Sequence, residues 1–350
     1  MTNKIYIIDP QNSILSKDLL KSLVVFFPNF EFELLSLNMK KSKKNPIIYM
    51  WSTFSLISKI KKNDLVILFS PLIIYAPFLF LNKSIKICLY FDFFPIHQIQ
   101  LKVITKFKKI LYLIERYLFN KKMYAVGLMS PKNIEFAKKY FNPNKTILFK
   151  APLWSFKKSV AVTSKKFNKK STIKVFFGGQ LINGRNIPFM ISFIKHIIYK
   201  FKNYEFHIFG SGKYELDFKR LSIKHKKIIF HGKKSHKEYF NKIQEFDIGL
   251  AFTNLNTSIP SYPSKSLDML LSGIPILGVS EKSSDFSAII NSSKSGEIIN
   301  TNDIKMLCKK LELIRNNYSI YSNNAIKFYN KSHFYSKSLK KLKNIIHEIK

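Results

Sequence analysis

Short apolar runs alternate with longer amphipathic segments along most of the chain. In the second half, the apolar runs have the length of buried strands, and they occupy residues 174–177, 204–209, 227–230, 247–252, 274–279 and 297–299. The segments between them repeat apolar residues at helical spacing, at residues 188–200, 214–222, 235–245 and 264–271. Strands that alternate with helices indicate a parallel sheet covered by helices on both faces.

Two local signals mark helix boundaries in this half. Ser235 precedes Glu238 at the spacing of a capping box, in which each side chain binds a backbone N–H group at the start of a helix. Gly273 follows the segment 264–271, where a left-handed residue commonly ends a helix. The sequence therefore predicts a helix start at Ser235 and a helix end at Gly273.

The first half of the chain repeats this alternation with weaker helical signals. Its strand-like runs occupy residues 4–8, 31–37, 65–69, 85–90, 123–128 and 146–149. Residues 156–171 are polar and rich in lysine and serine, which is typical of a connection between domains. A chain of 350 residues also exceeds one typical hydrophobic core. We therefore predict an α/β protein with two doubly wound domains, residues 1–155 and 172–325, joined by a linker at 156–171.

One uncharged segment, residues 65–82, is just long enough to be considered as a membrane span. Pro71 and Pro77 divide it, and the run before Ser70 has the length of a buried parallel strand. Proline is favoured in the first turn of a helix, so a helix can begin near Pro71. The segment therefore predicts a strand followed by a helix rather than a membrane span.

Composition supports a globular protein with anionic partners. Hydrophobic residues make up 46% of the chain and aromatic residues 15%, which argues against a disordered chain. Lysine and arginine number 59 against 21 acidic residues, and the formal net charge of +38 favours nucleic acid, acidic lipid or phosphorylated substrates as partners. Lys, Asn, Ile and Phe are also the residues that an AT-rich genome makes abundant, so the charge has two explanations.

Two further features narrow the partners and the compartment. The sequence contains no recognised nucleic-acid-binding module and its basic residues are scattered, so we expect no nucleic-acid partner. Cys88 and Cys308 lie far apart in apolar surroundings and fit neither a disulfide framework nor a metal motif. We expect buried free thiols in a reducing cytoplasm.

Two glycine-rich segments follow strands at the edge where open parallel sheets bind ligands. The segment GGQLINGRN contains Gly179 and Arg185, and the segment GSGK contains Gly210 and Gly212. Glycine lets the backbone approach a ligand closely, and arginine can bind a phosphate through two N–H groups. Ordinary turns after strands also use glycine, so either segment can be a simple connection.

The segment SYPSKSLDMLLSGIPIL places a carboxylate near the start of a short helix. A helix that begins at Ser264 presents free N–H groups and its positive end, which suit a phosphate. Asp268 lies one turn later on the same side, where it is suited to accept hydrogen bonds from sugar hydroxyls. Phosphate and neighbouring hydroxyls together describe the ribose end of a nucleotide. The alternative is that Asp268 only stabilises its own helix start, by about 0.3–1 kcal/mol.

Over residues 172–280, four blocks in order resemble the donor-binding domain of the GT-B glycosyltransferases of the family-4 type, also called glycosyl transferases group 1. The blocks are KVFFGGQLINGR, YEFHIFGSGKYE, IIFHGKKSHKEYFNKIQEFDIGLAF and SYPSKSLDMLLSGIPIL. The resemblance implies two Rossmann-like domains that face a cleft. It also implies that residues 326–350 are closing helices that cross back to the N-terminal, acceptor-binding domain.

The resemblance also assigns donor-binding roles. Asp268 stands where the family has a glutamate that binds the ribose hydroxyls, and Arg185 stands where a lysine contacts the diphosphate. Gly179 and the front of the Ser264 helix would donate backbone N–H groups to phosphate. No metal and no cofactor are implied, because basic side chains and helix dipoles stabilise the departing diphosphate.

The sequence departs from the family at two donor positions. Gln180 stands where the family has an arginine, and the nearby Lys265 is a cation able to replace it. Pro260 stands where many members carry a first glutamate that contacts the donor sugar. The identity of the sugar and the stereochemistry are therefore the least specified parts of the resemblance.

The acceptor side is expected just beyond the strand at 85–90. Asp92 and His97 lie there, and the histidine could bind the donor sugar or handle the acceptor proton. A histidine in this aromatic loop could equally be a packed side chain.

Residues 100–119 predict an amphipathic helix with an apolar face and four basic residues on another face. That helix could lie on an anionic membrane surface or be an ordinary covering helix with a solvated side.

We therefore expect a cytoplasmic glycosyltransferase that is peripheral on the inner face of the plasma membrane. It would transfer a sugar from a nucleotide diphosphate sugar to a saccharide acceptor, lipid-linked in our expectation, in bacterial surface polysaccharide synthesis. The family resemblance implies a retaining and metal-independent reaction. The alternatives are a GT-B nucleotide-sugar epimerase and a basic nucleic-acid-binding protein.

Overall fold

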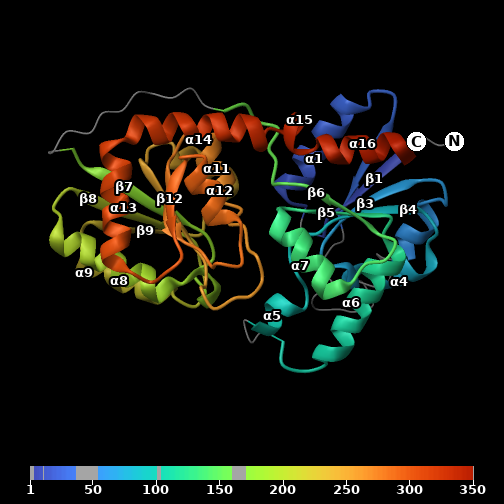
Figure 1. Ribbon diagram of the computed structural model, residues 1–350, viewed down its shortest axis with the longest axis horizontal. Helices are drawn as coiled ribbons and strands as arrows, with labels where there is room; N and C mark the ends of the chain where they lie inside the picture. Colours follow the sequence, from blue (N-terminus) through green and yellow to red (C-terminus); the bar gives the residue numbers. More distant parts are fainter. Residues whose placement is uncertain (1–3, 11, 37–53, 101–103, 160–170, 350) are drawn as a thin grey trace. The chain divides into compact units, whose positions relative to one another are not determined.

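The computed structural model describes residues 4–10, 12–36, 54–100, 104–159 and 171–349. The chain forms two units, residues 1–156 with 333–350 and residues 157–332. Each unit contains a six-stranded sheet (Figure 1). Most of the predicted linker, residues 160–170, lies outside the described residues.

The first unit is a parallel sheet in the strand order β2-β1-β3-β4-β5-β6. Its strands are β1 (Lys4–Ile8), β2 (Glu31–Leu35), β3 (Leu65–Phe69), β4 (Ile85–Leu89), β5 (Ala125–Leu128) and β6 (Ile147–Lys150). Its helices are α1 (Ile14–Phe26), the 3₁₀ turn η1 (Leu72–Tyr75), α4 (Ala76–Leu81), α5 (Ile96–Gln100), α6 (Lys108–Lys122), α7 (Pro131–Phe141), α15 (Tyr335–Ser338) and α16 (Lys340–Ile349).

Alternate residues of the first sheet enter different layers of the core, as the strand period requires. Ile7 and Ile67 pack with residues of α1 and with Leu342 and Ile346 of α16. Tyr90, just after β4, instead makes edge-on ring contacts with Phe119 of α6. Helix α16 therefore completes the core of the first unit.

The second unit has the strand order β12-β11-β10-β7-β8-β9, and all its neighbouring strands are parallel. Its strands are β7 (Ile173–Gly178), β8 (Tyr204–Phe209), β9 (Ile228–Gly232), β10 (Ile248–Phe252), β11 (Ile276–Val279) and β12 (Gly296–Ile299). Its helices are the turn η2 (Asn183–Arg185), α8 (Ile187–Lys200), α9 (Glu215–Lys224), α10 (His236–Ile243), α11 (Ser266–Leu271), α12 (Phe286–Ser292), α13 (Ile304–Asn316) and α14 (Tyr318–Ser332).

The strand and helix signals of the sequence are largely confirmed. Each of the twelve predicted runs overlaps one of the strands β1 to β12. Both halves of the capping box at Ser235 and Glu238 are present, and Gly273 has a φ of +66° at the end of α11. The uncharged segment 65–82 forms β3, η1 and α4, as predicted. None of the helices in the described parts of the chain is long and apolar enough to cross a membrane.

Two helix predictions need correction. The predicted helix at 100–119 is not continuous, because α5 ends at Gln100 and α6 begins only at Lys108. Phe107 has a left-handed φ of +54°, which an α-helix does not accommodate, so α6 starts after it. The helix expected from Ser264 begins at Ser266, because Ser264 and Lys265 form a turn before it.

The chain returns to the first unit later than residue 326, where we placed the return. Helix α14 belongs to the second unit, where the hydroxyl of Ser322 donates to the carbonyl of Gly273 at 2.5 Å. The first residue of the returning segment, His333, is bonded to the carbonyl of Leu153 at 2.7 Å through Nδ1. The two passages between the units thus follow Phe156 and Ser332.

Candidate functional site

Strands β7 and β10 form a topological switch point in the second sheet. They are adjacent, and the chain continues from β7 toward one edge and from β10 toward the other. In doubly wound sheets, ligands bind beyond the carboxyl ends of the strands at such a point. The two following loops touch each other here, since the backbone N–H of Asn254 donates to the carbonyl of Gly184 at 3.2 Å. Gly179, Arg185 and Asp268 all follow these two strands.

The loop after β7 is held by the loop after β8. The N–H of Gly179 donates to the carbonyl of Phe209 at 3.0 Å, so this donor is already used within the protein. Gly210 has a φ of +146°, and a Cβ on it would lie 1.8 Å from the carbonyl oxygen of Gly179. A Cβ on Gly212 would lie 2.7 Å from the carbonyl oxygen of Leu181. In the structure these three glycines are therefore accounted for by loop packing, and the expectation that Gly179 donates to a ligand is not supported.

Gln180 and Arg185 occupy the outer part of this loop. Gln180 is exposed, and Arg185 is partly buried at the end of the 3₁₀ turn η2. The backbone N–H of Arg185 donates to the carbonyl of Ile182 at 3.0 Å, which holds the turn. Arg185 therefore follows β7 on an ordered turn that is joined to the β10 loop through Gly184.

Asp268 is a buried carboxylate that is gripped from two sides. It is only 8% exposed. Its Oδ1 lies 3.2 Å from Nε2 of His236, and its Oδ2 lies 3.2 Å from Nζ of Lys265. Burial by itself raises the pKa of Asp268, but the hydrogen bond from His236 and the charge of Lys265 outweigh this and hold the pKa below its usual value. Asp268 thus points inward and is ionised at neutral pH.

The alternative function of Asp268, stabilising its own helix, receives limited support. Helix α11 is short, and the side chain of Asp268 is directed to Lys265 and to His236 of α10. The N–H groups of Ser266 and Leu267 already donate to the carbonyls of Pro263 and Ser264. The expected phosphate site at the front of this helix, including the exposed Ser264, remains a prediction.

Tyr239 is a residue that the sequence analysis missed. Its ring lies against Gly178 at the end of β7, where a Cβ would be 2.5 Å from the tyrosine hydroxyl. Nζ of Lys265 lies 4.2 Å from the centre of the same ring. The hydroxyl is buried and has no hydrogen-bond partner, which is costly for a polar group. Burial, and then the charge of Asp268, raise the pKa of Tyr239 well above its usual value, so the hydroxyl stays protonated.

Glu281 is a second residue that the sequence analysis missed. It follows β11 and is fully buried. Its carboxylate accepts hydrogen bonds from the backbone N–H of Ser261 at 2.7 Å, from the Ser261 hydroxyl at 2.6 Å and from the Thr253 hydroxyl. Glu281 therefore holds both ends of the loop that leads from β10 toward α11. A charged residue two positions after an apolar strand was the available signal.

The structure brings Asp92 and His97 together in the first unit. Asp92 follows β4, and its N–H donates to the hydroxyl of Ser70, which follows β3, at 3.2 Å. Nδ1 of His97 lies 3.7 Å from Oδ1 of Asp92, beyond a normal hydrogen bond but within an ion pair when the ring is protonated. Both side chains are substantially exposed, at 35% for His97 and 61% for Asp92. His97 is thus partly buried beside Asp92, and its catalytic role stays a prediction.

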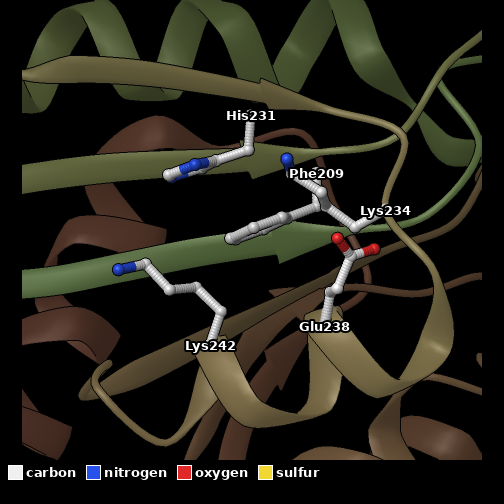
Figure 2. Close-up of a pocket in the computed structure, with 5 residues that line it drawn as sticks. All are labelled: Phe209, His231, Lys234, Glu238 and Lys242. Carbon is white, nitrogen blue, oxygen red and sulfur yellow. The ribbon is translucent and has the colours of Figure 1, made fainter.

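A pocket of about 220 Å³ lies between α10 and the ends of β8 and β9. Figure 2 shows its lining, with the rings of Phe209 and His231 parallel to each other and Lys242 and Glu238 reaching from α10. Lys234 is the fifth lining residue. None of the predicted donor residues lines it. Glu238 lies on the first turn of α10 with His236, so the pocket and Asp268 share that helix.

A chain of three polar side chains ends at this pocket. Nε2 of His207 lies 2.5 Å from the carboxylate of Glu205, and Nδ1 of His207 lies 2.9 Å from Nε2 of His231. Burial, and then the proximity of His207, lower the pKa of His231 to about 4, so it is neutral at pH 7. Among the described residues, no three His, Cys, Asp or Glu side chains are placed to hold a metal ion.

Comparison with known proteins identifies solved structures that share this fold. No protein-family model and no curated protein matches the sequence. Solved structures do match, among them TarM from S. aureus in complex with UDP and α-GlcNAc-glycerol, with a TM-score of 0.63 and 14% identity over 85% of this chain. The chain spans 58% of the length of TarM. The chain has the GT-B fold.

Two further GT-B neighbours match nearly their whole length. Sucrose-phosphate synthase from Thermosynechococcus elongatus has a TM-score of 0.75 and 9% identity, and the match covers 99% of this chain and 98% of that protein. WaaG, a glycosyltransferase involved in lipopolysaccharide biosynthesis, has a TM-score of 0.61 and 13% identity over 98% of this chain and 99% of its own. The predicted GT-B architecture of two Rossmann-like domains is therefore confirmed at the level of fold.

Proposed function

We propose that this protein is a glycosyltransferase that moves a sugar from a nucleotide diphosphate sugar to a saccharide acceptor. The observation that carries the proposal is the ionised, buried Asp268 beyond the switch point of β7 and β10 in a GT-B fold. The solved structures that share this fold include glycosyltransferases, and TarM was solved with UDP. A carboxylate held in place by His236 and Lys265 is preorganised to accept hydrogen bonds from vicinal hydroxyls.

On the donor side, Asp268 would bind the ribose and the basic residues would bind the diphosphate. Lys265 already lies beside Asp268, so a ribose at the carboxylate would bring the diphosphate near this ammonium group. Arg185 on η2 would supply a second cation. As the bond between the sugar and the diphosphate breaks, negative charge grows on the leaving oxygen, and these cations would stabilise it. We propose that the reaction is metal-independent and retaining.

On the acceptor side, we propose that Asp92 and His97 act on the saccharide hydroxyl that attacks the donor sugar. Their separation of 3.7 Å allows the carboxylate to orient the histidine that would bind this hydroxyl, and an oxygen of the departing diphosphate would take up the acceptor proton. The acceptor is proposed to be a lipid-linked saccharide in bacterial surface polysaccharide synthesis. The enzyme would then work in the cytoplasm at the inner face of the plasma membrane.

The decisive experiment is a thermal-shift screen of the protein with UDP-, GDP-, ADP- and CMP-sugars. The expected result is a rise in melting temperature with one class of nucleotide sugar, because ligands that bind only the folded state stabilise it. No shift with any class would contradict the proposal.

A turnover assay separates the proposal from an epimerase. With the donor that binds, a glycosyltransferase releases nucleotide diphosphate faster when a saccharide acceptor is present. An epimerase converts the donor sugar with no acceptor. Steeply salt-dependent binding of duplex DNA without nucleotide-sugar binding would favour the nucleic-acid alternative.

A further inference from the structure

Helix α6 carries apolar side chains on its outer face. Ile110, Leu113 and Tyr117 recur at helical spacing and are 55%, 49% and 45% exposed. Phe107, immediately before the helix, is 71% exposed. Leu118 and Phe119 of the same helix are fully buried. Helix α6 therefore has one apolar face in the core and a second, separate apolar face in solvent.

Helix α4 extends this apolar surface. Phe80 and Leu81 at its end are 49% and 59% exposed. The ring of Phe80 stacks on the ring of Tyr117, with centres 5.7 Å apart and an angle of 23° between planes. Figure 1 shows α4 and α6 as neighbours within the first unit. The α4–α6 patch thus consists of Phe80, Leu81, Phe107, Ile110, Leu113 and Tyr117.

A buried carboxylate fixes the orientation of the patch. Glu115 is fully buried on the inner side of α6. It accepts hydrogen bonds from the backbone N–H groups of Leu72 and Ile73, both at 2.8 Å, and from the hydroxyl of Tyr90 at 2.8 Å. These bonds tie α6 to the start of η1, just before α4. The outward direction of Ile110, Leu113 and Tyr117 is therefore set by a specific anchor rather than by loose packing.

In the described segments that carry the patch, residues 76–83 and 104–122, the exposed charged side chains are all basic. Exposed lysines flank it at positions Lys83, Lys106, Lys108, Lys109 and Lys121. Nζ of Lys122 lies 5.6 Å from the centre of the Phe80 ring. Glu115 is the only acidic residue in the sequence of α6, and its carboxylate faces inward. An apolar centre with a basic rim is complementary to the interface of an anionic lipid bilayer.

We propose that the α4–α6 patch docks this protein on an anionic membrane surface. The apolar side chains would enter the boundary between headgroups and acyl chains, and the lysines would contact lipid phosphates. Nucleic acid suits the patch less well, because the exposed aliphatic groups of Leu81, Ile110 and Leu113 would stay unburied against phosphates. The inference rests on the proposed function for its lipid-linked acceptor, but docking itself requires neither donor nor acceptor.

The test is flotation of the full chain with phosphatidylcholine vesicles, with and without phosphatidylglycerol. The wild type should bind the anionic vesicles and lose binding as salt is raised. Ile110→Ser with Leu113→Ser should lower the partition coefficient about tenfold or more, because apolar burial is lost. The matched control is Ile223→Ser on α9, where Ile223 is 85% exposed. Unchanged binding by the double variant would overturn the proposal.

Charge variants show whether membrane binding depends on the lysines beside the patch or only on the net charge of the protein. Lys108→Glu with Lys109→Glu should weaken binding about tenfold or more. Lys224→Glu with Lys226→Glu changes the net charge equally in the other unit and should leave binding near the wild-type value. Equal losses of vesicle binding in the two double variants would show that the lysines beside the patch have no specific role.

Three further measurements keep these results interpretable. If the variant on α6 unfolds, Leu81→Ser on α4 repeats the test on another element. Light scattering without lipid should show that the wild type and the patch variants have the same oligomeric state. If the wild type self-associates and the patch variants do not, the patch is a subunit interface and the proposal is wrong. Nucleotide-sugar binding should be unchanged in the patch variants, so loss of docking and failure of the proposed enzymatic function are distinguishable.

Discussion

Nε2 of His236 lies 3.2 Å from the carboxylate of Asp268, although the two residues are 32 positions apart in the sequence. His236 is the first residue of α10, and Asp268 lies on the first turn of α11. The starts of two helices therefore meet at one ionised carboxylate. This contact holds the Asp268 carboxylate in a fixed position, as the predicted ribose-binding role requires, and that role can be tested by mutation.

Asp268→Asn should weaken nucleotide binding while the fold stays intact. The change removes the charge of an acceptor that would bind the ribose hydroxyls, and hydrogen bonds to charged groups contribute about 1.5–3 kcal/mol. We therefore expect the dissociation constant for the preferred nucleotide to rise roughly 10- to 100-fold in calorimetry. Asp217→Asn, at an exposed position on α9, is the matched control. Unchanged affinity in Asp268→Asn would exclude the ribose role.

Arg185→Ala should affect the diphosphate more than the nucleoside. Its guanidinium group would contact phosphate oxygens, so the affinity for UDP, or for the diphosphate of the preferred base, should fall about tenfold or more while that for the nucleoside changes little. Arg220→Ala on the exposed side of α9 controls for loss of general positive charge. Equal losses for diphosphate and nucleoside would count against this assignment.

Tyr239→Phe should leave the ligand-free protein at least as stable as the wild type. The tyrosine hydroxyl is buried without a partner, so its removal relieves a desolvation cost of about 1–3 kcal/mol instead of breaking a bond. Tyr329→Phe is the contrasting control, because the Tyr329 hydroxyl donates to the carbonyl of Lys157 at 2.5 Å. That control should lose about 1 kcal/mol in the free energy of unfolding. A comparable loss in Tyr239→Phe would show that its hydroxyl has a partner in solution.

His333 should make the stability of the first unit depend on pH. Burial lowers its pKa from 6.5 to about 4 in the folded chain. Between these values the unfolded chain binds a proton that the folded chain does not, so stability is lost as the pH falls below 6.5. From pH 7 to pH 5, wild type should lose about 2 kcal/mol more than His333→Gln.

The measurement for His333 is denaturant unfolding followed by tryptophan fluorescence. Trp154 is buried in the core of the first unit, so its fluorescence reports the unfolding of that unit. The same loss of stability in the wild type and in His333→Gln would show that this histidine is not responsible.

The sequence predicted those features whose causes are local. Strand β8 is an apolar run of strand length, and the capping box at Ser235 requires only residues three positions apart, so both were found. The GT-B architecture followed from four local blocks in order. The partner of Asp268 was not found, because no local pattern links it to His236 across α10 and the loop before α11.

The site features that the sequence did not predict depend on which face of a helix is buried against the rest of the protein. No signal in the sequence singled out Tyr239, and only its packing on Gly178 revealed a buried hydroxyl without a partner. The predicted helix at 100–119 had the right amphipathic character, but Glu115 anchors α6 with Ile110 and Leu113 outward. Burial of a charged anchor is a tertiary property, and helical periodicity alone cannot reveal it.

The return of the chain at His333 has a consequence for the order of folding during synthesis. The second unit is continuous in sequence, so all of its strands leave the ribosome before α16 does. The first unit must wait with part of its apolar interior uncovered until Leu342 and Ile346 arrive. The lobe translated first is therefore the lobe that matures last, and a ribosome that stalls before Leu342 would leave it without its final hydrophobic layer.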